Sequence, residues 1–263
     1  MIRGIDHLVI ACPDPDEAAA NLESELGLAV TGGGRHPGAG SWNRIAWLAD
    51  GSYLELIGID DQDLASSSPV NAAALGALES GGGLATYSLL VDDIDLTVRG
   101  LQGAGATFGA PVHGSRTRDD GELVEWWVAF PDRPLAVDGV PFLIQHAYVG
   151  AEWGPEALAQ RALFDHPIGS PVHLRGLDIG ADDPASMGAT LHQELQLDVW
   201  VVGDLAVTDV GRHVLRVVPR RALGLPAVVT LGAEIPSPRS VELLAMRFVV
   251  EPAEAHAVTP PAD

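Results

Sequence analysis

The hydrophobic and polar positions of this chain repeat one order of elements three times. In the first stretch the apolar run IDHLVIA predicts a strand, and a helix start follows at once. Asp14 is the expected N-cap, and Pro15 occupies the first helical position. The helix should end near Leu26, because Gly27 follows it. Further strands are expected over 28–31, 43–48 and 53–57.

The same order returns at two later places. The second copy predicts strands over 85–91, 106–111, 123–130 and 141–146, with a helix over 92–101. The third predicts strands over 173–181, 199–202, 205–210 and 213–218, with a helix from Asp183 to about residue 195. Aligning Asp14 with Asp183 also aligns Leu22 with Leu191, so one offset fits the whole helix. The pattern therefore indicates an internal βαβββ repeat. Two more strands are expected, over 228–231 and 241–250.

The repeat predicts an α+β fold built from three related βαβββ units. We expect a paired domain over 1–150, a helical linker over 151–170 with its helix at 155–164, a third unit over 171–252, and a frayed tail over 253–263. The segment GGGRHPGAGSW is expected to form a loop, since glycine favours turns.

Composition and charge limit the possible partners. The 263 residues carry a formal net charge of −21, and all 15 basic residues are arginine. This field disfavours nucleic acid and anionic membranes, and the lack of lysine excludes Schiff-base and P-loop chemistry. No apolar run approaches the roughly 18 residues of a spanning helix. With a single cysteine, Cys12, and no secretory signal pattern, the chain is expected to be cytoplasmic.

Several motifs together resemble a known family. They are Asp6-His7-Leu8-Val9, the glycine-rich segment 34–43, Tyr53-Leu54-Glu55-Leu56, Pro141-Phe142-Leu143-Ile144-Gln145 and His166-Pro167-x-Gly169. In combination they resemble the vicinal oxygen chelate superfamily, which includes glyoxalase I, extradiol dioxygenases and bleomycin-resistance proteins. The closer resemblance is to its glyoxalase-like domain subfamily. The resemblance covers residues 1 to roughly 170. It implies that two βαβββ units pair into an open cup-shaped sheet, with the third related unit packed alongside.

The resemblance implies a metal site. In that superfamily the first and last strands of each unit can each send one side chain to a divalent metal, and the matching residues here are His7 and Glu55. An imidazole and a carboxylate suit Zn, Fe, Mn, Ni or Co. The later units depart from the pattern, because the matching places hold Thr86 and Leu143 in the second unit, and Gly176 with Leu215 or Arg216 in the third.

Each metal candidate also has an ordinary structural explanation. Glu55 lies in the apolar strand YLELIGI, and an inward-facing carboxylate is costly unless it is paired or coordinates a cation. It is therefore a candidate metal ligand and catalytic base, or the partner of an arginine such as Arg44. His7 is a candidate metal ligand, or a hydrogen-bonded histidine of the core. A metal would need further ligands, for which His36, Gln145 and His146 are candidates.

Four residues are candidates for contact with a substrate: His36, Asn43, Trp126 and Gln145. His36 can also shape the rim of the cup, and Asn43 can tie the glycine-rich segment to the next strand. Trp126 can line an aromatic wall, or pack in the core. Gln145 can point into the cup, or bond to the backbone.

These features lead to one functional hypothesis and two alternatives. The first is a divalent-metal enzyme of the lyase, isomerase or dioxygenase type, in which the metal is a Lewis acid toward a small oxygen-bearing molecule and Glu55 moves a proton. The second is a metal-free binding or sequestration protein of the resistance type. In the third, the degenerate units serve assembly alone. The expected partner is a small-molecule ligand, and a homodimer is a compatible assembly.

Overall fold

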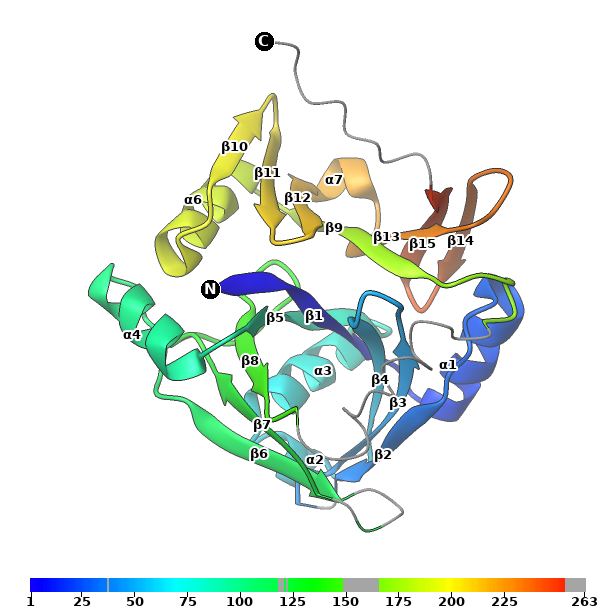
Figure 1. Cartoon of the computed structure of the whole chain (residues 1–263), viewed down its shortest axis with the longest axis horizontal. Helices are drawn as coiled ribbons and strands as arrows, with labels where there is room; N and C mark the ends of the chain where they lie inside the picture. The colour runs from blue at the N-terminus through cyan, green and yellow to red at the C-terminus, as the bar shows by residue number, and fades with distance from the viewer. Residues whose placement is uncertain (37, 118–120, 122, 149–165, 254–263) are drawn as a thin grey trace.

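A computed structural model describes residues 1–36, 38–117, 121, 123–148 and 166–253. The chain has an α+β fold with two mixed sheets, each containing parallel and antiparallel strand pairs. The first sheet curls into a half-barrel in the lower part of Figure 1, and the second sheet lies above it. The expected linker helix at 155–164 and the tail from residue 254 lie outside the described residues. No helix of the described part is long and apolar enough to cross a membrane.

The first sheet joins two βαβββ units through their first strands. Its order is β2-β3-β4-β1-β5-β8-β7-β6, with β1 parallel to β4, β5 parallel to β8, and β1 antiparallel to β5. The strands are β1 (Ile2–Ala11), β2 (Gly32–His36), β3 (Ser41–Trp47), β4 (Tyr53–Ile59), β5 (Gly83–Val91), β6 (Val112–Thr117), β7 (Leu123–Ala129) and β8 (Phe142–His146). The helices are α1 (Pro15–Asn21), the π-helical turn η1 (Leu22–Leu26), α2 (Gln62–Ala65), α3 (Pro69–Glu79) and α4 (Ile94–Gly103).

The first helix begins and ends as its sequence predicts. The Asp14 carboxylate accepts hydrogen bonds from the backbone amides of Asp16 and Glu17, and Pro15 is the first helical residue. Gly27 ends η1 in the left-handed region, with φ of 70°. Local capping chemistry therefore sets both ends of this segment.

The second sheet repeats the arrangement of the first, with order β10-β11-β12-β9-β13-β15-β14. Its elements are β9 (His173–Ala181), α6 (Pro184–Leu195), β10 (Val199–Val202), β11 (Leu205–Val210), β12 (His213–Pro219), α7 (Arg220–Leu223), β13 (Ala227–Ala233), β14 (Arg239–Leu243) and β15 (Met246–Pro252). The central run β12-β9-β13-β15 has the same strand directions as β4-β1-β5-β8. The third βαβββ unit thus pairs with an incomplete fourth, in which no helix separates β13 from β14, a stretch that is fully described.

Several predicted boundaries are wrong. The strands expected over 28–31 and 106–111 lie instead at β2 and β6, so the first part of the expected glycine-rich loop forms a strand, whereas residues 38–40 form a turn. Glycine is needed there, because Gly33 has a φ of 129° and a Cβ atom would collide with the Asn43 carbonyl oxygen. The strand expected over 241–250 is a hairpin, which turns at Leu244 and Ala245 with positive φ angles. Helix α3 was not predicted.

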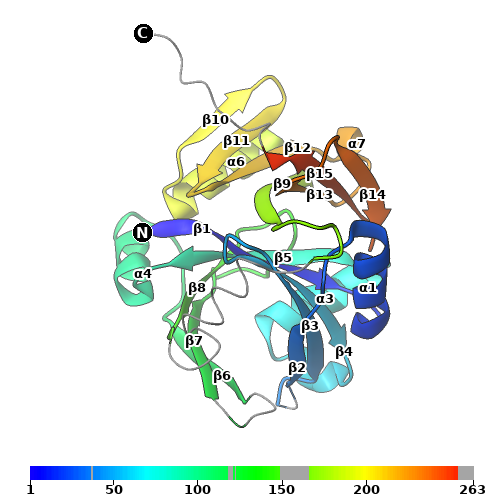
Figure 2. The same cartoon turned by 45° about the vertical axis from the view of Figure 1, so that its right-hand side comes forward.

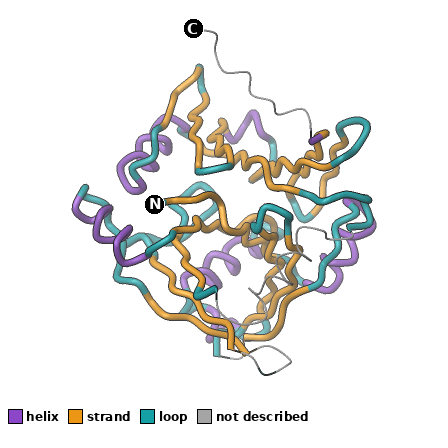
Figure 3. The backbone as a smooth tube through the Cα atoms, in the orientation of Figure 1, coloured by secondary structure: helices purple, strands orange, loops and turns teal. Residues whose placement is uncertain are grey.

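The two sheets pack against one another through one continuous hydrophobic core. It includes Leu8 and Leu89 from the first sheet, and Leu177, Leu215 and Phe248 from the second. Figure 2 shows that the two layers stay distinct after a 45° turn, with α6 near α4 on one side and α1 near β14 on the other. Figure 3 shows how strands make up most of both layers. On the opposite, concave face of the first sheet, α3 packs against part of the surface, where Ala74 joins Val9 and Ala11 in a smaller core, and the rest of that face remains available for a site.

Candidate functional site

A cavity of about 300 Å³ lies on the concave face of the first sheet. Its polar side comes mainly from the first unit, where β1, β3 and β4 supply His7, Asn43 and Glu55. Its opposite wall comes from β7 and β8 of the second unit, and includes Trp126 and Phe142. The cavity is therefore asymmetric, with a row of polar groups facing an apolar and aromatic wall.

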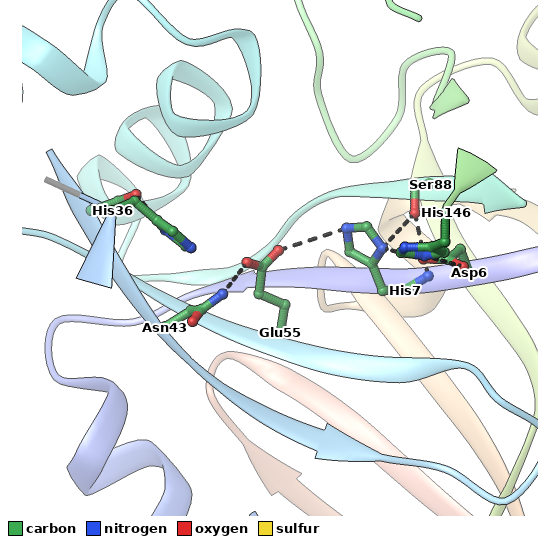
Figure 4. Close-up of polar contacts among 8 residues, drawn as sticks. Asp6, His7, His36, Asn43, Glu55, Ser88 and His146 are labelled. Carbon is green, nitrogen blue, oxygen red and sulfur yellow. Dashed lines mark hydrogen bonds and ion pairs between the residues drawn. The ribbon is translucent and has the colours of Figure 1, made fainter. Parts of the chain in front are cut away.

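His7 is held firmly on the floor of this cavity. It is 4% exposed, its ring stacks on Tyr53 at a centroid distance of 4.5 Å, and the Phe142 ring forms a T-shaped contact with it at a centroid distance of 5.5 Å. Its Nδ1 atom is 2.8 Å from Asp6 Oδ2 and 2.7 Å from Ser88 Oγ. Nε2 is thereby directed toward Glu55, as Figure 4 shows. The ring orientation is fixed by the two aromatic contacts and by the contacts at Nδ1.

Glu55 reaches the cavity from β4, and both of its oxygens have a neighbour. Oε1 accepts a hydrogen bond of 2.6 Å from Asn43 Nδ2, while Oε2 is 3.6 Å from His7 Nε2. The side chain is 13% exposed. Arg44, the alternative partner considered from the sequence, instead pairs with Asp16 at 2.6 Å. The carboxylate is thus oriented by the Asn43 amide, with His7 Nε2 beside its second oxygen.

Two of the predicted substrate-contact residues extend the polar side. Asn43 Oδ1 accepts from the backbone amide of Gly34, so this residue ties β2 to β3 as well as orienting Glu55. His36 lines the cavity, and its Nδ1 lies 3.2 Å from Ser41 Oγ. Both residues are therefore placed where a bound molecule can meet them.

Trp126 lines the opposite wall of the cavity, whereas Gln145 does not contact the cavity. Gln145 Oε1 instead accepts a 2.7 Å hydrogen bond from the backbone amide of Ile94, the first residue of α4. On β8 the residues that line the cavity are Phe142, Ile144 and His146, so Leu143 and Gln145 belong to the other face. Of the two roles considered from the sequence, Gln145 therefore has the backbone hydrogen bond, which stabilises a helix start.

The same alternation corrects the residue that matches Glu55 in the second unit. Val9 pairs with Glu55, and the corresponding pair across β5 and β8 is Ser88 with Phe142. Phe142 rather than Leu143 therefore occupies the place, since a shift of one residue turns a strand side chain to the opposite face. In the second sheet this place holds Arg216, which pairs with Asp178 at 2.6 Å.

Asp6 and His146 are site residues that the sequence did not predict in these roles. Asp6 is 3% exposed, and its carboxylate contacts both His7 and His146 Nε2, the latter at 3.1 Å. Burial alone would raise the pKa of Asp6, but His146 above all, together with His7, holds it well below its usual range. The pairing of β1 with β5 shifts register between Ile5 and His7. Such an irregularity is not visible in an alternating sequence pattern.

The described residues do not complete a metal centre. His7 Nε2 and Glu55 Oε2 are separated by 3.6 Å, a distance that two ligands of one divalent ion can span with bonds of about 2.0–2.2 Å. A catalytic zinc ion, however, normally has three protein ligands. Within the described part of the chain, no group of three or more His, Cys, Asp or Glu residues is arranged to hold a metal ion. A divalent ion held by this pair would need at least one further ligand.

Comparisons with known proteins agree with this architecture. A family model described as "Glyoxalase-like domain" matches residues 5–195. The crystal structure of a hypothetical protein from Staphylococcus aureus is similar with a TM-score of 0.78 and 14% identity, covering 96% of this chain and all of that one. A Streptomyces coelicolor methylmalonyl-CoA epimerase bound to 2-nitronate-propionyl-CoA gives a TM-score of 0.41 and 19% identity, over 56% of this chain and 99% of the epimerase. The Mycobacterium tuberculosis epimerase gives 0.40 and 19%, over 54% and 86%.

Among curated protein sequences none matches the chain. The Staphylococcus aureus structure, at 14% identity, supports the fold alone. The family model, in contrast, spans well over half of the sequence, from β1 to the end of α6. It includes every residue of the cavity described above. The chain therefore belongs to the glyoxalase-like domain family.

Proposed function

We propose that this protein binds a small oxygen-bearing organic molecule in the cavity and moves a proton on it through Glu55. The observation that carries the proposal is the Glu55 carboxylate, which reaches the cavity with one oxygen held by Asn43 and the other 3.6 Å from His7 Nε2. Because the carboxylate is already held in position, little free energy is lost in orienting it when a substrate binds. Glu55 is thus the candidate general base, in an isomerase or lyase type of reaction.

The rest of the cavity supports this assignment. A volume of about 300 Å³ is at the lower end of known small-molecule sites, so the ligand should be small. Trp126 and Phe142 can cover its apolar part and exclude water from the reacting atoms. His36 and Ser41, on the polar side, can donate hydrogen bonds to its oxygens.

Solvent hydrogen exchange tests the proposal directly. The protein is incubated in D₂O with a panel of hydroxyketones, 1,2-dicarbonyl thiol adducts and catechols, and loss of carbon-bound hydrogen is followed by NMR. Glu55→Gln should lower the exchange rate by roughly 10²–10⁴-fold, because the base is lost while the shape is kept. Glu125→Gln is the matched control, since Glu125 pairs with His113 on an exposed part of β7. Equal exchange by Glu55→Gln and wild type would disprove the role of Glu55.

A second candidate is a divalent-metal enzyme of the lyase, isomerase or dioxygenase type. It is favoured by the approach of His7 Nε2 to Glu55 Oε2. A bound metal would supply Lewis-acid chemistry, with ligands beyond this pair still to be found. Metal content should be measured after purification without chelator, in wild type, His7→Ala and Glu55→Ala. Stoichiometric metal that both variants lose supports this candidate, whereas metal content unchanged by the variants rejects the pair as its site.

A third candidate is binding without chemistry, as in sequestration. The observation in its favour is Phe142, an apolar residue at the place that matches Glu55 in the second unit. Calorimetry with the same compound panel identifies this case. A compound that binds tightly in the cavity, but neither exchanges hydrogen nor turns over, would support sequestration against the first two candidates.

A further inference from the structure

Asp6 forms a buried bridge behind the candidate site. Its Oδ2 atom is 2.8 Å from Nδ1 of His7, and its two oxygens lie 3.1 and 3.2 Å from Nε2 of His146. His7 comes from β1 and His146 from β8, so the bridge joins the two units of the first sheet. Figure 4 shows Asp6 on the side of His7 that faces away from Glu55.

The bridge constrains the hydrogen atoms on the two nitrogens that face Asp6. An ionised carboxylate accepts hydrogen bonds and donates none. Both Asp6 oxygens lie within hydrogen-bond distance of imidazole nitrogens, as they would in an ionised carboxylate. Each nitrogen that touches Asp6 then carries a proton, which places one on Nδ1 of His7 and one on Nε2 of His146.

We propose that Asp6 is a positioning residue, which holds His7 in the Nδ1–H tautomer and thereby presents a lone pair on Nε2 to the cavity beside Glu55. This inference rests on the proposed function only in taking Glu55, the group beside Nε2, as the base. His146 anchors Asp6 from the second unit. The second unit therefore contributes to the polar side of the site, although its own matching places hold Thr86 and Phe142.

The tautomer has a consequence for the ligand. In this state both Nε2 of His7 and Oε2 of Glu55 are hydrogen-bond acceptors, and their separation of 3.6 Å is too long for a direct hydrogen bond. Two acceptors side by side are best satisfied by a donor that lies between them. The ligand class that fits is a molecule with a hydroxyl or enol O–H near its reacting carbon, rather than one that offers carbonyl oxygens alone.

Ser88 provides the means to test this idea. Its hydroxyl is 2.7 Å from Nδ1 of His7. If Asp6 is removed, this hydroxyl can donate to Nδ1, and His7 is expected to move its proton to Nε2. The Nε2–H group would then point at Glu55, and the acceptor presented to the ligand would be lost.

Long-range ¹H–¹⁵N correlation spectra of the ligand-free, full-length protein at one fixed pH report the tautomer, because protonated and lone-pair imidazole nitrogens resonate far apart. His7→Gln identifies the His7 signals. Wild type should show Nδ1–H, whereas Asp6→Ala and Asp6→Leu should shift the major form to Nε2–H. Ser88→Ala, which keeps Asp6, and Asp178→Asn, in the second sheet, should leave the wild-type pattern unchanged.

An Nε2–H form in the wild type would overturn the proposal, and this result does not depend on the folding of any variant. An unchanged His7 pattern in folded Asp6→Ala or Asp6→Leu would also overturn it. The measurement uses no substrate, so its outcome is separate from that of the hydrogen-exchange assay. If Glu55→Gln abolishes exchange while the tautomer is Nε2–H, the proposed function stands and the role of Asp6 is rejected.

Discussion

Asp50 links the two sheets at a buried position, and its removal should destabilise the whole chain. It lies in the turn between β3 and β4, with a side chain that is 10% exposed. Its carboxylate accepts from His213 Nε2 at 2.8 Å and from the Leu174 backbone amide at 3.3 Å, both in the second sheet. The other nitrogen of His213, Nδ1, accepts from the Ile5 amide of β1 at 2.9 Å.

The magnitude follows from the donors that Asp50→Ala leaves without an acceptor. A buried donor that loses its partner costs about 1–3 kcal/mol, and three are affected here, one each on His213, Leu174 and Ser52. Near the lower end of that range for each donor the sum is roughly 3–4 kcal/mol, which agrees with the cost of breaking a buried charged pair. For a chain of this size each kcal/mol lowers the Tm by roughly 2–4 °C. The expected fall in Tm is therefore roughly 6–16 °C.

Differential scanning calorimetry measures this difference, with Asp60→Ala as the control. Asp60 pairs with Arg35 at 2.8 Å, but their side chains are 40% and 68% exposed. An exposed pair contributes about 0–1 kcal/mol, so the control should change the Tm by only a few degrees. An Asp50→Ala variant as stable as Asp60→Ala would refute the reasoning, because the buried donors would then have found other partners.

Three further predictions concern Asp50, Gly33 and Gln145. Burial raises the pKa of Asp50, but bonding to His213 and the charge of Arg212 outweigh it and lower the pKa. The stabilisation by Asp50 is therefore present above the unfolded pKa of about 3.9, and it is lost as the pH falls through the lower folded value. In urea unfolding, the free energy of unfolding should therefore fall less steeply at acid pH in Asp50→Asn than in wild type. Gly33→Ala should disrupt the pairing of β2 with β3, seen as loss of amide protection along 32–36 in hydrogen exchange, whereas unchanged protection would contradict the steric argument. Gln145→Ala should lower the free energy of unfolding by about 1 kcal/mol through the start of α4, without changing ligand affinity by calorimetry; a loss of affinity would return Gln145 to the cavity.

The sequence determined the elements whose signals are local. Asp14 and Asp183 cap their helices as expected, and β9, α6, β10 and β11 match their predicted bounds. Capping and alternation act within a few residues of the chain, so they can be recognised without knowledge of the partner strands. The resemblance to the glyoxalase-like domain family, which rested on short motifs around His7 and Glu55, was confirmed by the family match.

Tertiary structure decided the features that depend on pairing between strands far apart in the chain. Strand register decides which β8 side chains face the cavity, and it places Phe142 at the cavity and Gln145 at α4. A register error of one residue reverses this assignment. The irregular pairing of β1 with β5 places Asp6 between His7 and His146, residues separated by 139 positions from one another in the chain. Interaction between such distant residues depends on how two sheet halves meet, and a single sequence carries no local signal for that.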